Sequence, residues 1–365
     1  MYKKYEMTTY ERMSRIYDHK EPDRVPITDW IWPSTIDRWR REGLPNDVDT
    51  LDVREYLGMD NIVELSIMDI DTTPRFKSRI IEETDTYIIE QDAYGITKKN
   101  FKPISATFEH IDHIIKDPDS WLKAKKNMTP ASDRINWNRL RKNYKRWREE
   151  GAWIIAMPWY GYDVVSTRMC GSVTIFYAMA ENPEWAADMF NHGCDLSLKL
   201  LDMIWDEGYT FDELFWYDDM AYRNGMLFSK AMWKELLRPY QQRTVEWAHS
   251  HGIKVQLHCC GNINSLIPDL IELGVDALNP LEVKAGMVPT EIKKLYGEKL
   301  VLKGGFDVRN WEVFEKAEAD IKTVLPVMMT SGGYVFASNH SIPDSVSLEN
   351  YKQIIKLVKE TGKYK

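Results

Sequence analysis

The chain has 365 residues, of which 44% are hydrophobic and 28% are charged, as in ordinary globular proteins with a sizeable core. Its formal net charge of -8 argues against nucleic acid or an acidic membrane surface as a partner. No segment approaches the roughly 20 consecutive apolar residues that a membrane-spanning helix needs, so we expect no contact with a membrane.

The four cysteines, at positions 170, 194, 259 and 260, do not make a disulfide framework, which favours a reducing compartment. The N-terminal stretch MYKKYEMTTYERMSRIYDHKEPDRVP lacks the apolar run of a secretory signal. We therefore expect a cytoplasmic protein. Its oligomeric state stays open, a homodimer included.

The first predicted helix begins after Thr8, because Thr8 and Glu11 have the spacing of a capping box, and it ends at Pro22. Short strands are predicted in RVPITDW (24–30) and in NIVELSIMDI (61–70). These elements form an N-terminal helical extension and the first two strands of the main fold.

A different pattern follows at about 79–102, where runs rich in Ile and Tyr are separated by the turn sequences ETD and AYG. This pattern predicts a β-hairpin or meander, which we interpret as an insertion in the main fold. A charged region at about 117–150 is predicted to be helical.

From residue 153 onward, apolar strands alternate regularly with helices. The six strands predicted in this part are WIIAMPW (153–159), DELFWYDD (212–219), IKVQLHC (253–259), VDALNP (275–280), KLVLKGG (299–305) and GYVFAS (333–338). With the two earlier strands they make eight strand–helix units, which predict a closed (β/α)8 TIM barrel with parallel strands. No linker divides residues 1–365, so we expect a single domain.

In such a barrel the functional residues lie at the carboxyl ends of the strands. Aromatic residues gather at three of these ends, in WIW, PWYGY and FWYDD, and we expect them to line a pocket for a flat or aromatic ligand. The candidate substrate-binding residues from these groups are Trp30, Trp32, Trp159, Tyr160, Tyr162 and Trp216. For each of them, packing in the core is the alternative.

The sequence HCCG, at the end of one predicted strand, brings a histidine and two thiols together. His258 and Cys260 are two residues apart, so on an extended strand they point to the same face and make half of a zinc site. Cys259 would point the other way, toward the helices, as a small apolar residue. The alternative is a hydrogen-bonded core histidine beside two packed thiols.

The sequences HCCGNINSLIPDLIELGVDALNPLEVKAGM, LYGEKLVLKGGFDVR and GGYVFASNHSIPDSVSLENYKQI together resemble the uroporphyrinogen decarboxylase superfamily. The resemblance is closer to its corrinoid- and cofactor-M-linked methyltransferase branch. It covers the chain well from Asp212 to the end, and only loosely over the first 150 residues. It implies a (β/α)8 barrel, in agreement with the strand count.

True decarboxylases of this superfamily carry an N-terminal RQAGR-type segment that binds substrate carboxylates. The matching region here reads DWIWPSTIDRWRREG, where aromatic residues replace that anchor. Asp69, in MDIDTTP, matches the central aspartate of the decarboxylases and is a candidate catalytic residue. One shared acid without the arginine anchor is weak support for decarboxylation, because uroporphyrinogen is a polycarboxylate that needs several cations.

The methyltransferase branch resembles this chain at HxCG, whose histidine and cysteine bind zinc in that branch. Its third zinc ligand is a cysteine, and this chain has His340 at the matching position. The resemblance therefore implies a metal set of His258, Cys260 and His340. Decarboxylases also tend to have a histidine there, so His340 binds substrate in the alternative interpretation.

The carboxylates near these strand ends are further candidate catalytic residues. Asp218, Asp219 or Glu282 would complete the metal shell, orient a ligand or protonate the leaving group. Their alternative roles are helix capping and loop solvation. Arg168 is a candidate for holding a single carboxylate, such as that of a methoxybenzoate, and a structural arginine is the alternative.

The resemblance implies transfer of a methyl group to a corrinoid on a separate partner protein, and the aromatic strand ends favour a methoxylated aromatic compound as the methyl donor. Zinc would act as the Lewis acid that stabilises the leaving phenolate. The alternatives are a methylcobalamin:thiol methyltransferase, a uroporphyrinogen decarboxylase-type enzyme, and a non-catalytic barrel that binds an aromatic or tetrapyrrole ligand.

Overall fold

The computed structural model describes residues 6–48, 53–102 and 108–365, and its central element is a seven-stranded parallel sheet. The strands follow one another around the sheet in chain order: β1 (Ile62–Leu65), β6 (Trp153–Ala156), β7 (Glu213–Tyr217), β10 (Lys254–His258), β11 (Ala277–Asn279), β12 (Val301–Lys303) and β13 (Tyr334–Val335). Neighbouring strands joined in order by helices are the arrangement of a TIM barrel.

The extended segment 25–31 lies between the two edge strands of this sheet. Ile27 forms a parallel bridge with Phe336, just after β13. The Ile27 carbonyl accepts a hydrogen bond of 3.0 Å from the Asp60 amide, just before β1. The first predicted strand is thus a bridging segment and no full strand, because Pro26 has no N–H to donate. The eight-part barrel expected from the sequence is confirmed.

The apolar core has two parts, one inside the barrel and one between the strands and the helices. The larger part packs the outward faces of the strands against the helices, and the smaller part fills the barrel interior. Because both faces of each strand are buried, the strands read as nearly continuous apolar runs.

Helix α1 (Thr9–Tyr17) closes the end of the barrel opposite to the carboxyl ends of the strands. Its Met13, Ile16 and Tyr17 belong to the interior cluster, and the Tyr17 ring stacks on Trp153 with centroids 5.5 Å apart. The capping box predicted at Thr8 is present, with both reciprocal hydrogen bonds to Glu11.

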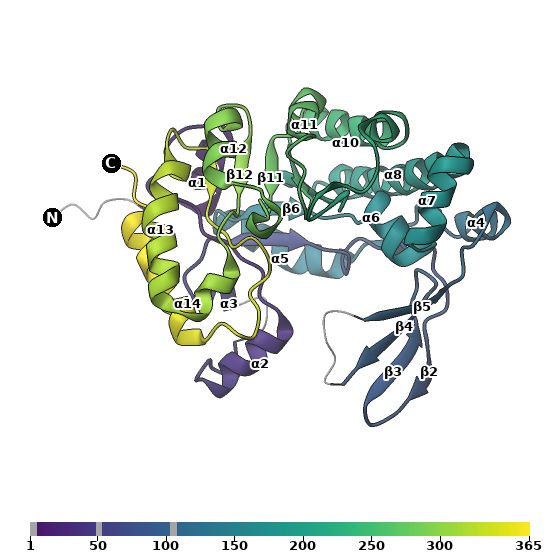
Figure 1. The fold of residues 1–365 in the computed structure, drawn as a ribbon, viewed down its shortest axis with the longest axis horizontal. Coiled ribbons are helices and arrows are strands. Elements are labelled where there is room, and N and C mark those ends of the chain that lie inside the picture. The colour runs from purple at the N-terminus through teal and green to yellow at the C-terminus, as the bar shows by residue number, and fades with distance from the viewer. Residues whose placement is uncertain (1–5, 49–52, 103–107) are drawn as a thin grey trace.

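Helices surround the sheet and contribute the outer layer (Figure 1). The longer ones are α5 (Trp137–Glu149), α7 (Ser172–Glu181), α8 (Pro183–Asp206), α10 (Arg238–Ser250), α13 (Phe314–Met329) and α14 (Leu348–Thr361). Shorter ones are α2 (Pro33–Arg41), α3 (Val53–Tyr56), α4 (Pro118–Lys125), α6 (Tyr162–Val164), α9 (Lys230–Met232), α11 (Ile267–Leu273) and α12 (Pro289–Tyr296). None of the described helices combines the length and the apolar character needed to cross a bilayer.

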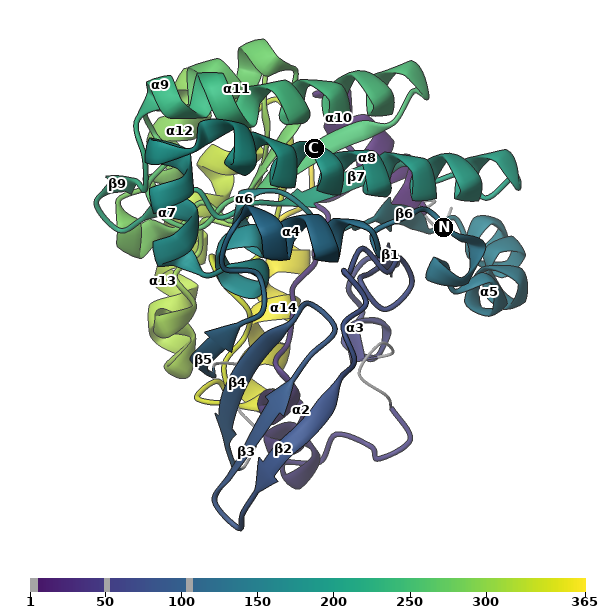
Figure 2. The same ribbon diagram turned by 90° about the vertical axis from the view of Figure 1, so that its right-hand side faces the viewer.

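A four-stranded antiparallel sheet is inserted between β1 and β6. Its strands are β2 (Arg79–Glu83), β3 (Tyr87–Gln91), β4 (Ile96–Phe101) and β5 (Glu109–His113). The predicted insertion at 79–102 therefore continues for one more strand, past residues 103–107, which lie outside the described part. In both views the sheet projects from the barrel (Figures 1 and 2).

Candidate functional site

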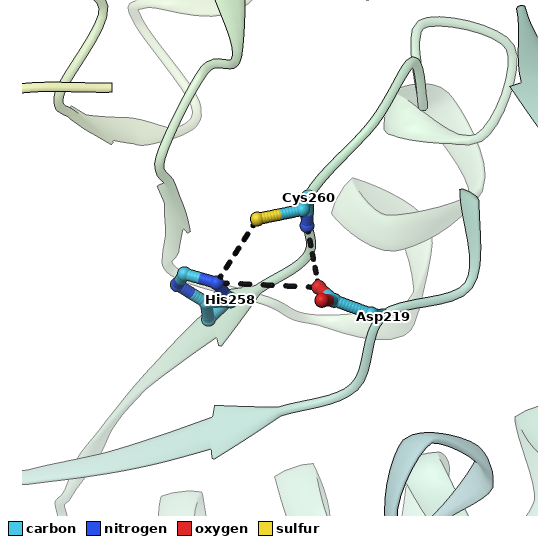
Figure 3. A group of neighbouring side chains, drawn as sticks. All are labelled: Asp219, His258 and Cys260. Atoms are coloured by element: carbon cyan, nitrogen blue, oxygen red, sulfur yellow. Dashed lines mark hydrogen bonds and ion pairs between the residues drawn. The ribbon is translucent and has the colours of Figure 1, made fainter. Parts of the chain in front are cut away.

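Three possible metal ligands meet at the carboxyl ends of two neighbouring strands. His258 is the last residue of β10, Cys260 follows it, and Asp219 follows β7 (Figure 3). The His258 Nε2 atom lies 3.5 Å from Cys260 Sγ and 4.0 Å from an Asp219 oxygen. One ligand atom from each residue lies within 4.8 Å of the others. Nitrogen, sulfur and carboxylate oxygen are the donors that zinc prefers.

Asn279 fixes the tautomer of His258. Its Oδ1 lies 2.6 Å from His258 Nδ1, while its Nδ2 donates to the Lys303 carbonyl at 3.4 Å. Because Oδ1 can only accept, His258 Nδ1 carries the proton. The Nε2 lone pair therefore faces Cys260 and Asp219, as in a metal-bound histidine that is oriented by its other ring nitrogen.

Tyr217 and Trp30 hold the imidazole from the inside of the barrel. The Tyr217 ring stacks on His258 with centroids 4.5 Å apart and 13° between planes, and its hydroxyl donates to Asp219 at 3.0 Å. Trp30 lies parallel to the imidazole at 6.4 Å. The other Asp219 oxygen, which lies 4.0 Å from His258 Nε2, accepts from the Cys260 amide at 2.6 Å. These contacts position all three candidate ligands before any metal arrives.

The burial of the site favours the uncharged forms of its ligands. Burial raises the pKa of the Cys260 thiol well above its ordinary value, and the nearby carboxylates of Asp219 and Glu282 raise it further. Burial also lowers the pKa of His258. Neutral imidazole is the ligating form, and a divalent cation would supply the positive charge that a thiolate needs here. The donor set, the fixed tautomer and this electrostatic environment fit zinc.

Replacing Asn279 with alanine should lower zinc affinity by about 10- to 100-fold, because His258 would lose the partner that fixes its tautomer. Competition with a chelator measures the affinity. Asn264→Ala, which removes an exposed asparagine in the turn before α11, is the control and should bind zinc normally. Equal affinities in the two variants would show that Asn279 does not orient the ligand.

Glu282 fixes the loop that follows Cys260. Its carboxylate accepts from the Gly261 amide at 2.5 Å and pairs with Lys284 at 2.9 Å. Glu282 does not belong to the group of three candidate ligands. It therefore shapes the turn that presents Cys260.

Gly261 approaches another backbone too closely for a side chain. Its φ is +86°, and a Cβ would lie 2.6 Å from the Ala221 carbonyl carbon and 2.7 Å from the Tyr222 amide. We expect Gly261→Ala to lower the free energy of unfolding by roughly 1–3 kcal/mol more than a control. The control is Gly252→Ala, which has a φ of +70° but no atom within 4 Å of the new Cβ. Urea unfolding measures both, and equal losses would contradict the steric argument.

Two cavities that share three lining residues lie at this end of the barrel, and His258 and Cys260 line one of them. The inner cavity, of about 170 Å3, is lined by residues that include Trp30, Phe215, Tyr217, His258, Cys260, Asn279, Lys303 and His340. The outer cavity, of about 680 Å3, shares Trp30, Phe215 and Tyr217 and is also lined by Glu64, Phe108, His110, Trp159, Asp163 and Arg168. Phe108 and His110 come from the inserted sheet. The shared walls are aromatic, as in sites for flat ligands.

The model of the uroporphyrinogen decarboxylase (URO-D) family matches residues 165–361, more than half of the chain. The chain belongs to the uroporphyrinogen decarboxylase family. A methyltransferase from Methanosarcina mazei has a similar structure, with a TM-score of 0.68 and 16% identity over 97% of this chain and 99% of that one. At that identity the likeness shows the shared fold.

A second similar structure is a Listeria monocytogenes protein described as a vitamin-B12 independent methionine synthase. Its TM-score is 0.41 and its identity 10%, over 93% of this chain and 98% of that one, which is too distant to inform function. No curated protein matches the sequence significantly.

In this family member, three of the predicted substrate-binding residues face the cavities. Trp30 lines both, and Trp159 and Arg168 line the outer one. Arg168 stands over the rings of Phe108 at 4.6 Å and Trp159 at 5.2 Å and pairs with Asp92 at 3.5 Å. Its guanidinium is therefore already engaged.

Three other predicted aromatic residues lie in the layer between strands and helices. Trp216 and Tyr160 are stacked with their planes 3° apart, and both rings pack near Tyr240. Tyr162 packs edge-on against Phe228. The interpretation of these three as pocket residues is therefore corrected. The alternation along β7 turns Trp216 outward and its neighbours inward, and Tyr160 and Tyr162, which follow β6, are buried in the same cluster as Trp216. Cys259, predicted to face the helices, is indeed buried in this layer.

Trp32 and His340 meet at the rim of the inner cavity. Their rings are edge-on with centroids 5.7 Å apart, and His340 is exposed and lines that cavity. The structure thus places Asp219, and not His340, within ligand distance of His258 and Cys260.

Asp218 and Asp69 line neither cavity. Asp218 accepts from the Tyr240 hydroxyl at 2.6 Å and from the Asp163 amide at 2.8 Å, and burial raises its pKa to about 7. Asp69 is buried and pairs with Arg139. Both carboxylates hold neighbouring loops together outside the two cavities. Their position does not support the catalytic role predicted for them.

Phe215, Tyr217, Asn279, Asp163 and Lys303 were not singled out as site residues from the sequence, although Phe215 and Tyr217 belong to the predicted aromatic group FWYDD. Phe215 and Tyr217 alternate with Trp216 on β7, and Asn279 and Lys303 end neighbouring strands, so their inward direction follows from the pairing of these strands, which no local pattern encodes. Asp163 accepts from Trp159 Nε1 at 3.0 Å, and burial raises its pKa well above the ordinary value. No sequence signal marks Asp163.

Proposed function

We propose that the protein is a methyltransferase that moves a methyl group from a methoxylated aromatic compound to a corrinoid carried by a separate protein. The observation that carries the proposal is the group of Asp219, His258 and Cys260 beside a cavity with aromatic walls. Membership of a family of decarboxylase and methyltransferase type, and a fold shared with a methyltransferase, support it.

The residues that would hold zinc are Asp219, His258 and Cys260, with His340 as a further candidate from the rim of the same cavity. Bound zinc would supply a Lewis acid for the oxygen of an aryl methyl ether, a poor leaving group without such help. The methyl group itself would pass to the corrinoid.

The chain's own residues bind and orient the substrate in this proposal. Trp30, Phe215 and Tyr217 would hold the ring in the passage between the two cavities, because their side chains line both. Asp163 lines the outer cavity, where burial raises the pKa of its carboxyl, and in its protonated form it would donate a hydrogen bond to a substrate oxygen. These contacts would leave the methoxy group facing His258 and Cys260.

The charges around the cavities disfavour a polycarboxylate such as uroporphyrinogen. Among the described residues that line the two cavities, Lys303 and Arg168 are the lysines and arginines, while Asp29 and Glu64 are acidic. A substrate with many carboxylates would meet repulsion from the acidic groups and too few cations. A ligand with one acidic group at most suits this balance.

The test is to incubate the zinc-loaded protein with a reduced corrinoid protein and a panel of methoxybenzenes and methoxybenzoates. Methylcobalamin and the matching phenol should form together, and Cys260→Ala should form both far more slowly. No product across the panel, with a corrinoid protein known to accept methyl groups, would refute the proposal. Consumption of methylcobalamin on adding a thiol would instead identify the thiol methyltransferase.

A further inference from the structure

We infer that Lys303 binds a carboxylate of the substrate, so that the methyl donor is a methoxylated aromatic acid held with its acid group on the floor of the inner cavity. The inference rests on the proposed function and names its substrate class. It assigns the anion to Lys303 and not to Arg168.

Lys303 stands at the same level of the barrel as the candidate metal ligand His258. It is the last residue of β12, and its carbonyl accepts from Asn279, which is paired with His258 in the register of β10 and β11. The strands of His258 and Lys303 are separated by one strand, so their backbones lie roughly 10 Å apart across the sheet. Both side chains line the inner cavity. One aromatic ring with two substituents spans such a gap.

The ammonium group of Lys303 interacts with Glu213, Glu64 and Asp29 only at longer range. Within the described part of the chain no hydrogen bond or ion pair reaches its Nζ, whose nearest recorded contact is the Phe215 ring at 5.8 Å. Burial lowers the pKa of Lys303, so an anionic partner would stabilise its charged form. An unpaired cation inside a cavity is a group that a ligand can satisfy.

Two of the acidic groups near Lys303 are already occupied. Asp29 accepts from Ser338 at 2.8 Å and from Tyr351 at 2.8 Å. Glu64 accepts from Trp30 and Arg54, each at 2.8 Å. Neither carboxylate comes within ion-pair distance of Lys303, so the positive charge is left for the cavity.

Glu213 offers the competing explanation, in which Lys303 only balances a buried charge. One Glu213 oxygen accepts from Trp153 at 2.7 Å, and the other is buried without a hydrogen-bond partner. Glu213 nevertheless makes no ion pair with Lys303. If Lys303 only balances the charge of Glu213, substitution of Lys303 should lower the stability of the protein. If Lys303 binds the substrate, its substitution should remove the preference for anionic ligands. The two effects can be measured separately.

Arg168 is the other cation in the cavities, and it is less available. Its guanidinium pairs with Asp92 and stacks over Phe108 and Trp159 at the outer end. A carboxylate there would compete with Asp92, while a carboxylate at Lys303 would displace no protein group. Because the inner site is more enclosed, the charge-assisted bond would also be stronger there.

The experiment compares binding of 4-methoxybenzoate and its neutral analogue 4-methoxybenzamide by calorimetry, without any corrinoid. The wild type should bind the acid about 10- to 100-fold more tightly than the amide. This ratio corresponds to the free energy of one hydrogen bond between charged groups. Lys303→Met should lose this preference, Lys303→Arg should keep part of it, and Arg168→Met should keep most of it. Thermal unfolding of each variant reports stability separately.

Lys303→Met with an unchanged preference, a preference lost only in Arg168→Met, or no preference in the wild type would each overturn the inference. A variant that is less stable but keeps the preference would assign Lys303 to balancing Glu213. Binding needs no methyl acceptor, so failure of methyl transfer with an intact acid preference would refute the proposed function alone.

Discussion

Replacing Cys260 with alanine should remove zinc from the purified protein and lower methyl transfer by roughly a thousandfold. Cys260 is the sulfur donor of the candidate group, 3.5 Å from His258 Nε2. A Lewis acid contributes several kcal/mol to a step with a poor leaving group, and each 1.36 kcal/mol is about a tenfold change in rate. Elemental mass spectrometry measures zinc per chain, and formation of methylcobalamin measures the rate.

Cys259→Ala is the matched control for this substitution. The two thiols are adjacent, but Cys259 is buried in the layer between strands and helices, where its sulfur accepts from the Met220 amide at 3.2 Å. This variant should keep about one zinc per chain and lose some stability. Equal zinc contents in the two variants, whether full or absent, would contradict the assignment of Cys260 as a ligand.

Replacing Arg12 with methionine should lower the free energy of unfolding by about 3 kcal/mol, because it removes the cation paired with Asp23 and leaves the buried Asp60 with Arg24 as its remaining cation. Arg12 is 1% exposed and donates to both oxygens of Asp23 at 2.8 Å. It also pairs with the buried Asp60, whose other oxygen accepts from the Ile27 amide at 2.7 Å. Arg12 therefore links helix α1 to the segment that closes the barrel.

Urea unfolding followed by tryptophan fluorescence measures this loss. Arg15→Met is the control on the same helix, since Arg15 is exposed and donates only to the Glu21 carbonyl at 2.8 Å. Its effect should stay within about 0.5 kcal/mol, as for most surface substitutions. Similar losses in both variants would show that the buried ion pairs contribute little beyond helix formation.

Only part of the candidate metal centre could be predicted from a local sequence pattern. His258 and Cys260 lie two residues apart on one strand, so their common direction follows from the period of a strand and was predicted. Asp219 joins them because β7 pairs with β10 and places Tyr217 opposite His258. That pairing joins residues about 40 positions apart, and no local pattern encodes it.

The aromatic residues of β7 show the same limit. The sequence FWYDD predicted an aromatic strand end correctly, but Trp216 was chosen where Phe215 and Tyr217 face the cavities. Three consecutive aromatic residues show no alternation of polar and apolar side chains. The sequence alone therefore does not indicate which of them face the barrel interior. The packing of Trp216 against Tyr160 and Tyr240 settles it.

The sequence by itself determined the barrel, because alternating apolar strands and amphipathic helices are local patterns with fixed periods. It also determined the capping box at Thr8 and the shared face of His258 and Cys260. Only the tertiary structure decided that Asp219 and not His340 stands beside them, and that Lys303 enters the inner cavity unpaired. Those facts depend on strand register and on which side chains fill the barrel, and both arise from contacts between segments distant in the chain.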